Sequence, residues 1–507
     1  MIYGGDNLYL FGILFALFTV IVGIILQSKF FWNLHKFWAF VMSIMVGTSI
    51  GLLIFSRIDP IILSLIIFIQ IYRLFSFLRL VASRLNTEQL RARTIRSELA
   101  LNSFLLFVVA IWSFDYYFAI PAQTNVFVLA SVQLLFCLVL IRHFKYIRLG
   151  SAFKFPKKLT ADVDLPSLTV ALPARNETKN LNECLKDLLQ SDYPKLEILV
   201  LDDCSLDSTP DIIRDFAHRG VRFVEGKTPP KGWLAKNYAY QQLLDEAEGK
   251  YIIFCGVDTH FDKKTHRLLI ERLINNRLSM LSVLPTRSHK YVKSFFLQPM
   301  RYWNELFYPK FFKQNLPVLS TCWLMDKKIL KNFGGFSGYK NNIRPEQLIA
   351  EKVAKDNRYK FLFSFDGLGL YSTKGLGDQW QTALRGKYPE LKNRPENVLV
   401  RSLFLLFIVF SPFFMFVQAI VFGWFYVAIL CLLSILILLY MQFCLNLYVF
   451  KSSNLIWVLF LPLMIIMEVI VVNYSMWAYE FSKVIWKGRN ICMPVLRAYP
   501  KLPKVDM

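Results

Sequence analysis

Long apolar segments lie at both ends of this 507-residue chain, with a polar segment between them. A helix needs roughly 20 apolar residues to cross a hydrocarbon core of ~30 Å, and most of these segments approach that length. The candidates before the polar segment are residues 9–26, 38–55, 60–80, 101–120 and 125–141. Those after it lie within residues 401–450 and 456–472. The pattern predicts a folded domain inserted between two groups of transmembrane helices.

Basic residues flank the apolar segments. The chain carries 59 Lys and Arg against 36 Asp and Glu, a net charge of +23. They gather after the first, third and fifth segments and after the last one, so the positive-inside rule predicts that the central domain and the tail face the cytoplasm. Nucleic acid is the other usual partner of a basic chain. We expect none here, because zinc-finger and aromatic RNA-binding signatures are absent.

Four regions follow from these patterns. We predict an N-terminal membrane region of about five spans (1–150), an α/β domain (160–398), a C-terminal membrane region (400–475) and a basic cytosolic tail (476–507). Three full crossings after the domain would place the tail outside. We therefore expect residues 401–416, which include Pro412, to be interfacial or re-entrant, followed by two spans. The protein would be a multi-pass cell-membrane protein.

The eight scattered cysteines indicate neither disulfides nor zinc, and we interpret His260 and His266 as surface residues.

Three short apolar runs in the central segment end in polar residues. Residues 170–172 lead into Pro-Ala-Arg-Asn-Glu, residues 198–201 into Asp202 and Asp203, and residues 251–254 into a turn with Asp258. A nearly continuous apolar run suits a strand that is buried on both faces of a parallel sheet. Ligands of such sheets bind at the carboxyl ends of the strands. We therefore expect these carboxylates to converge on one crevice.

Two motifs point to a family. Leu-Pro-Ala-Arg-Asn-Glu at 172–177 and Asp-Asp-x-Ser-x-Asp-x-Thr at 202–209 resemble the inverting family 2 glycosyltransferases of GT-A fold. Residues 229–236 resemble the Gly-Trp-x-Gly-Lys element of their membrane-bound branch, which includes hopanoid-associated and carotenoid glycosyltransferases, with Ala235 replacing the second glycine. Trp-Lys-Gly-Arg at 486–489 is similar to the basic segment that often follows the last span of these enzymes. The resemblance implies a Rossmann-like GT-A domain with a mostly parallel sheet.

The resemblance and the residue types imply a nucleotide-sugar donor in the crevice. Carboxylates would accept hydrogen bonds from the base and ribose, and cations would face the diphosphate. We predict donor contacts from Pro173, Arg175, Glu177, Asp202, Asp203, Asp207, Lys236 and Asp258. We place Trp233, Trp380, Arg385 and Lys387 on the leaving-group or acceptor side. The alternatives are that Asp207 only caps a turn, that Lys236 is a solvated surface residue and that the tryptophans are interfacial anchors.

Two positions depart from the family pattern. The Asp-x-Asp after the third strand is reduced to Gly256 and Asp258. Asp258 would then be the only carboxylate that holds a divalent metal, Mg²⁺ or Mn²⁺, and the binding would be weak. Alternatively, the metal would be dispensable. The family's general base is the Asp of a Glu-Asp pair, but the matching place reads Glu346-Gln347, and a glutamine cannot accept a proton at neutral pH. Either Glu346 acts as the catalytic base instead, or the chemistry is impaired.

Three functions are compatible with these features. The first is a membrane-integral glycosyltransferase that moves a single sugar, with inversion, from a nucleotide-sugar to a lipid or membrane-associated acceptor. The Gln-x-x-Arg-Trp motif of processive synthases is absent, since residues 381–386 are one residue too long and lack the Trp, which favours single transfer. The second is a catalytically impaired glycosyltransferase-like scaffold. The third is a transporter or flippase-like protein with a regulatory GT-A domain.

Overall fold

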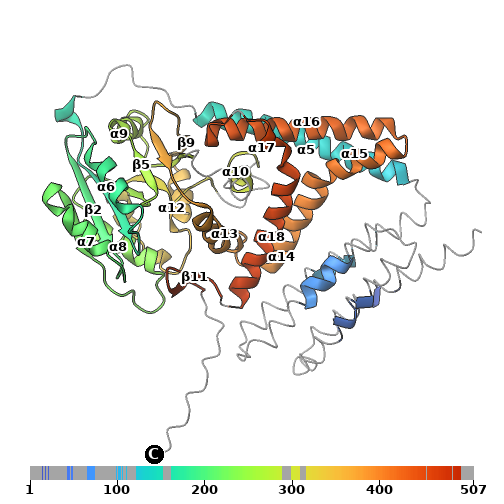
Figure 1. Ribbon diagram of the computed structural model, residues 1–507, viewed down its shortest axis with the longest axis horizontal. Coiled ribbons are helices and arrows are strands. Elements are labelled where there is room, and N and C mark those ends of the chain that lie inside the picture. The colour runs from blue at the N-terminus through green and yellow to red at the C-terminus, as the bar shows by residue number, and fades with distance from the viewer. Residues whose placement is uncertain are drawn as a thin grey trace, which may run out of the picture.

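The computed structural model describes residues 122–151, 161–287, 299–308, 316–452, 454–481 and 483–492, with short pieces of the first 121 residues. The first four predicted spans and the tail beyond residue 492 lie largely outside the described residues. Within the described part, the central domain lies at one end and a group of long helices at the other (Figure 1).

The central domain is built on a seven-stranded sheet in the order β3-β2-β1-β4-β8-β6-β9. Its strands are β1 (Leu168–Ala174), β2 (Leu196–Asp202), β3 (Val221–Glu225), β4 (Tyr251–Cys255), β6 (Met280–Leu284), β8 (Cys322–Asp326) and β9 (Tyr359–Phe363). Strand β8 runs antiparallel to both of its neighbours, and the other neighbouring pairs are parallel. The predicted mostly parallel α/β sheet is therefore confirmed.

Helices cover both faces of this sheet. One face packs against α6 (Leu181–Leu189), α7 (Thr209–Asp215) and α9 (Thr265–Asn275), and the other against α8 (Ala235–Glu246), α11 (Lys327–Asn332) and α12 (Pro345–Ala354). Successive side chains of a strand point to opposite faces, so Val170 and Leu172 enter the first core while Ala171 enters the second. Burial on both faces explains why the strands read as continuous apolar runs.

Smaller elements complete the domain. They are the sheet β5-β10-β7 (Thr259–Phe261, Leu370–Ser372 and Thr286–Arg287), the helices α10 (Pro299–Leu306) and α13 (Leu376–Glu390), and the 3₁₀ turns η2 (Asp162–Asp164), η3 (Ala217–Arg219) and η5 (Ser337–Tyr339). The expectation that His260 and His266 are surface residues is wrong, because both are buried. The His260 ring contacts Asp187 and Thr373, and His266 stacks on Phe261, so each fills a gap between packed elements.

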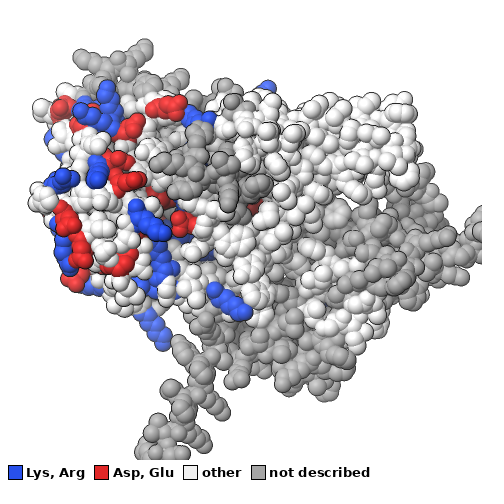
Figure 2. Space-filling model, in the orientation of Figure 1, with Lys and Arg blue, Asp and Glu red and all other residues white. Residues whose placement is uncertain are grey.

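Among the described residues, four helical segments are long and apolar enough to cross a membrane. They are α5 (Ala122–Ser151), the continuous run α14–η6–α15 (Pro395–Phe404, Leu405–Phe410 and Ser411–Val421), α16 with η7 (Phe425–Leu445 and Asn446–Phe450), and α18 (Leu461–Glu480), which the short α17 (Ile456–Leu459) precedes. Figure 2 shows the charged side chains gathered over the central domain and few on the helical half. Large apolar side chains such as Phe425 and Ile429 are exposed there, which is consistent with membrane association.

Residues 401–416, expected to be interfacial or re-entrant, lie inside one helical run of 27 residues. A proline removes one helical hydrogen bond and crowds the carbonyl four residues earlier. Here the π-helical segment η6 directly precedes Pro412 and provides a wider turn at that place. The helix therefore continues through the proline, and its length is enough for a full crossing.

The helices pack directly on the domain. Trp303 of α10 donates a hydrogen bond from its ring nitrogen to Gln442 of α16 at 2.7 Å, within a shared apolar core. Helix α13 lies along α18, where Lys387 forms a buried ion pair with Glu468. These contacts couple the domain to the apolar helices.

Candidate functional site

The carboxyl ends of β1 and β4 meet at one edge of the sheet, where residues at and after them line a crevice of about 140 Å³. We call it the strand-end crevice. Its lining includes Pro173, Glu177, Gly256, Asp258, Lys374 and Arg385. Carboxylates from two strand ends do therefore converge, as the position of ligand sites in parallel sheets requires.

Asp202 and Asp203 lie at the end of β2, beside the end of β1, and neither is among the described residues that line the crevice. Arg489 donates hydrogen bonds to both carboxylate oxygens of Asp203, at 2.7 and 2.6 Å. Burial raises the pKa of Asp203, and the Arg489 guanidinium opposes that rise. Asp202 accepts a hydrogen bond from the backbone N–H of Ser205 at 3.2 Å, so its carboxylate holds the loop.

Asp207 is exposed to solvent and is not among the described residues that line the crevice. Its carboxylate accepts a hydrogen bond at 3.1 Å from the backbone N–H of Thr209, the first residue of α7. This is the turn-capping role that was the alternative for Asp207.

A hairpin with a two-residue turn lies over the crevice, formed by β11 (Ile485–Trp486) and β12 (Arg489–Asn490). Lys487 and Gly488 form its turn, with φ of 46° and 81°, the positive pair that a type I′ turn requires. The Lys487 ammonium forms an ion pair with Glu177 and donates to the Asn176 carbonyl at 3.2 Å. Arg175 donates to the Lys487 carbonyl at 3.0 Å. The hairpin is thus fastened to the strand ends, and Arg175 positions it rather than facing the crevice.

Asp258 lies in the turn after β4. Ser372 donates to its carboxylate at 3.3 Å, and the Lys374 ammonium is 3.8 Å away. Burial alone would raise the pKa of Asp258, but Lys374 and Arg287 outweigh it and hold the pKa below its ordinary value. A Cβ at Gly256 would lie 2.6 Å from an oxygen of Asp258. The glycine therefore leaves room for this orientation of an ionised carboxylate.

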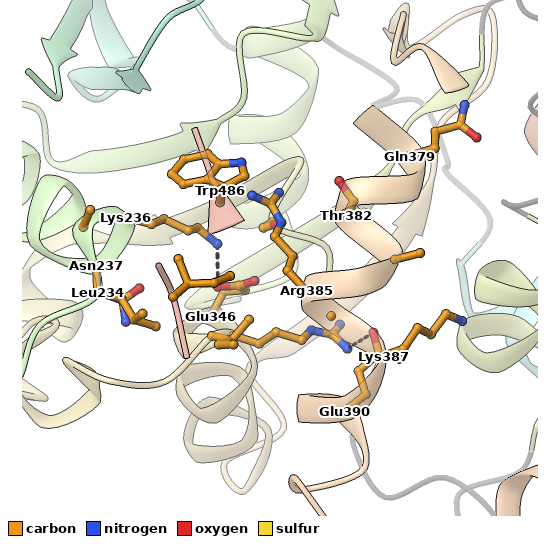
Figure 3. A pocket seen from close by; sticks show the side chains of 17 residues that line it. Leu234, Lys236, Asn237, Glu346, Gln379, Thr382, Arg385, Lys387, Glu390 and Trp486 are labelled. Atoms are coloured by element: carbon orange, nitrogen blue, oxygen red, sulfur yellow. Dashed lines mark hydrogen bonds and ion pairs between the residues drawn. The ribbon is translucent and has the colours of Figure 1, made fainter. Parts of the chain in front are cut away.

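A second cavity, of about 80 Å³, adjoins the strand-end crevice, and we call it the α12 pocket. Lys236, Ser320, Thr382, Arg385 and Trp486 line both. Glu346 lines the α12 pocket, and its carboxylate lies 3.4 Å from the Lys236 ammonium (Figure 3).

The electrostatics of the α12 pocket follow from its burial. The Glu346 side chain is 1% exposed. Burial lowers the pKa of Lys236, and the Glu346 carboxylate opposes that shift. Arg385 lies over the ring of Trp486 at 4.9 Å, so its guanidinium is held at the boundary between the two cavities.

Gln347, the neighbour of Glu346 on α12, faces elsewhere. Its amide donates to the Glu351 carboxylate at 3.3 Å, and it lines a third cavity. The two residues at the place of the family's Glu-Asp pair therefore line different cavities. Glu346 lines the α12 pocket, which adjoins the strand-end crevice, and Gln347 lines the third cavity.

Three residues assigned to the leaving-group or acceptor side have other contacts. The Lys387 ammonium pairs with Glu468 and points away from Lys236 and Glu346 (Figure 3). Trp380 stacks on Tyr474 of α18 at 5.9 Å, and Trp233 packs against Tyr238 at 5.5 Å. Neither tryptophan is among the described residues that line the crevice or the α12 pocket.

Sequence reasoning missed two cations that line the crevice, Lys374 and Lys487, and a third, Arg287, that acts on the charge of Asp258. Lys374 and Arg287 come from the β10 and β7 ends of the small sheet, and no motif marks them. Lys487 lies in the Trp-Lys-Gly-Arg segment, which was recognised, but its place over the strand ends depends on the tertiary fold.

Residues 169–334 match the sequence model of the family described as glycosyl transferase family 2. The matched segment runs from β1 through α11 and contains the strand-end carboxylates, Lys236 and Asp258. The central domain is a family 2 glycosyltransferase domain. Together with the mostly parallel sheet, the match confirms the predicted GT-A fold.

Named relatives agree with this assignment. YdaM of Bacillus subtilis, a probable glycosyltransferase, is 32% identical over 117 residues, 22% of this chain and 28% of the relative. The 4,4'-diaponeurosporenoate glycosyltransferase of Staphylococcus aureus is 31% identical over 134 residues, 25% of this chain and 34% of the relative. The match thus spans about a third of these relatives. A solved mannosyltransferase, PcManGT from Pyrobaculum calidifontis in complex with GDP-Man and Mn²⁺, is 14% identical with a TM-score of 0.41, covering 69% of this chain and 99% of that one.

Proposed function

We propose that this protein is a membrane-integral glycosyltransferase that moves one sugar, with inversion, from a nucleotide-sugar to a lipid or membrane-associated acceptor. The observation that carries the proposal is the position of Glu346, a buried carboxylate in a pocket that adjoins the strand-end crevice of a family 2 domain. The apolar helices packed on the same domain support an acceptor that comes from the membrane.

The reaction follows from the residues around the two cavities. The donor diphosphate would lie in the strand-end crevice, near Lys374, Arg385 and Lys487. An acceptor hydroxyl in the α12 pocket would attack the anomeric carbon of the donor from the side opposite the diphosphate. Glu346 would take the proton of this hydroxyl. The bond from the anomeric carbon to the diphosphate oxygen breaks, and the cations stabilise the negative charge that the leaving group keeps.

A divalent metal fits this crevice in a limited way. Among the described residues, no group of three or more His, Cys, Asp or Glu side chains could hold a metal ion. Asp258 would hold the metal through its single carboxylate, with donor phosphates and water as the other ligands, an arrangement that Mg²⁺ tolerates. Bound there, the metal would neutralise charge on the diphosphate.

The hairpin bears on membrane topology. Because Arg489 contacts Asp203, the tail up to the hairpin and the domain lie on one side of any membrane. An even number of full crossings must therefore separate them. We propose that α14–η6–α15 and α16 cross the membrane. Half of the apolar segment of α18 is buried against the protein, so we propose that α18 stays against the domain at the membrane surface.

Cysteine labelling tests this topology. With a cytoplasmic domain, Phe422→Cys on a cysteine-free background should react with an external label, whereas Lys250→Cys and Lys483→Cys should not. External labelling of Lys483→Cys would contradict this topology.

The function is tested by offering the purified protein in lipid vesicles a panel of uridine, guanosine and thymidine diphosphate sugars and measuring release of the nucleoside diphosphate. We expect release with at least one donor, and slower release by Asp258→Asn. Tight nucleotide binding without release from any donor would favour the scaffold alternative over the enzyme.

A further inference from the structure

A third cavity lies beside Gln347, and we call it the rear cavity. Its volume is about 460 Å³, within the range of roughly 300–1,000 Å³ that is usual for small-molecule sites. Ile343, Arg344 and Ile491 line both the rear cavity and the α12 pocket. The rear cavity is therefore a direct neighbour of the pocket that holds Glu346.

The lining of the rear cavity is rich in amides. It includes Asn341, Asn342, Gln347 and Asn393, with Glu351 and Lys392 beside them. A primary amide both donates and accepts hydrogen bonds, which matches neutral hydroxyl groups. The strand-end crevice, in contrast, presents Lys374, Arg385 and Lys487, which suit a diphosphate. The two spaces thus favour ligands of different chemistry.

The rear cavity also lies where α14, the start of a proposed span, and α18, the helix proposed to stay at the membrane surface, meet the domain. Tyr479, in its wall, is next to the last residue of α18. Pro389 in the last turn of α13 and Asn393 in the loop before α14, which begins at Pro395, also lie in the wall. The end of a membrane-spanning helix lies at the depth of the lipid head groups, and a helix held at the membrane surface lies at the same depth. A head group could therefore enter the rear cavity without leaving its bilayer.

We propose that the rear cavity binds the head group of the acceptor, and that this head group is polyhydroxylated, a sugar or polyol carried on a lipid. The inference rests on the proposed function, because it identifies the molecule from which Glu346 takes a proton. One hydroxyl extends past Ile343 and Arg344 towards Glu346, and the others bind the amides. Gln347 then has a binding role, which accounts for a glutamine at the second position of the Glu-Asp pair.

A photoreactive alkyl glucoside tests the proposal. The probe is octyl β-glucoside with a diazirine on the alkyl carbon nearest the sugar. It is added to the whole chain in lipid nanodiscs. After irradiation, the labelled peptides are identified by mass spectrometry. We expect labels in peptides 341–351 and 389–393, competed by unlabelled octyl glucoside but not by octylphosphocholine. Labels spread over the apolar helices, or equal competition by octylphosphocholine, would overturn the proposal. Equal competition by free glucose would overturn the lipid source of the head group.

Matched variants separate this proposal from the function on which it rests. Gln347→Leu should lower labelling about fivefold, the effect of one lost hydrogen bond. The exposed Asn341→Ala should lower it without risk to folding, and Gln190→Leu, at the exposed end of α6, should not change it. UDP and GDP binding is measured on the same samples. No nucleotide binding by the wild type would contradict the proposed function, whereas intact nucleotide binding without label in the rear cavity would overturn only the head-group site.

Discussion

Replacing Arg489 by alanine should release the hairpin β11–β12 from the strand-end crevice. The substitution removes both hydrogen bonds to the Asp203 carboxylate, at 2.6 and 2.7 Å. The Asp203 side chain is only 7% exposed, so its charge would remain buried without that counter-charge. The contacts of Lys487 with Glu177 and the Asn176 carbonyl would remain.

The size of the effect follows from this geometry. Removing one partner of a fully buried ion pair costs about 3–5 kcal/mol. The Arg489 side chain is 21% exposed, which places the pair at or below the lower end of that range, about 2–3 kcal/mol. Opening of the hairpin should therefore become roughly 30- to 150-fold more frequent.

Hydrogen exchange of peptide 483–492 measures this opening directly. Amides of the hairpin should lose protection by the stated factor in Arg489→Ala. Arg489→Lys, which keeps the charge but not the planar fork, should lose less. Lys483→Ala is the control, because this ammonium lies over the Trp477 ring at 4.3 Å and outside the crevice. Equal exchange in wild type and Arg489→Ala would refute the role given to the ion pair.

Three further predictions concern the domain. Gly256→Ala should weaken nucleotide-sugar binding in calorimetry, because its Cβ would lie 2.6 Å from an oxygen of Asp258; unchanged affinity would contradict the role of this carboxylate. Burial lowers the pKa of His266 to about 4, so the unfolded chain takes up the proton first as the pH falls from 6.5. The contribution of the neutral His266 ring to stability is therefore complete above pH 6.5 and about 2 kcal/mol smaller at pH 5. Between pH 6.5 and pH 5, the melting temperature of His266→Leu should fall less than that of the wild type. Gln347→Asp should not raise the rate of transfer, because residue 347 faces the rear cavity; a faster enzyme would identify the wild type as an impaired relative.

The large sheet could be predicted from sequence because its strands are buried on both faces. The runs before Asp202 and Asp258 are β2 and β4, and the cores on their two sides explain their continuous apolar character. The small sheet could not be predicted, since strands of two or three residues show no periodicity. Lys374, which that sheet brings close to Asp258, is separated from it by more than a hundred residues of chain.

The arrangement of the site depends on packing that no local pattern encodes. Glu346 and Gln347 are adjacent in the chain, and about 100° of helix rotation decides which one faces the crevice side. The contact between Arg489 and Asp203 joins positions 286 residues apart. A motif can indicate that both segments matter, but only the tertiary fold shows that one covers the other.

The central claim is that Glu346 removes the acceptor proton while other residues bind the donor. The most direct test is the rate of sugar transfer to membrane lipid at saturating nucleotide-sugar, compared between wild type and Glu346→Gln, with nucleotide affinity measured on the same preparations. The account predicts a transfer rate lower by about 10²–10⁴-fold and a nearly unchanged affinity. Transfer by Glu346→Gln at close to the wild-type rate would contradict it.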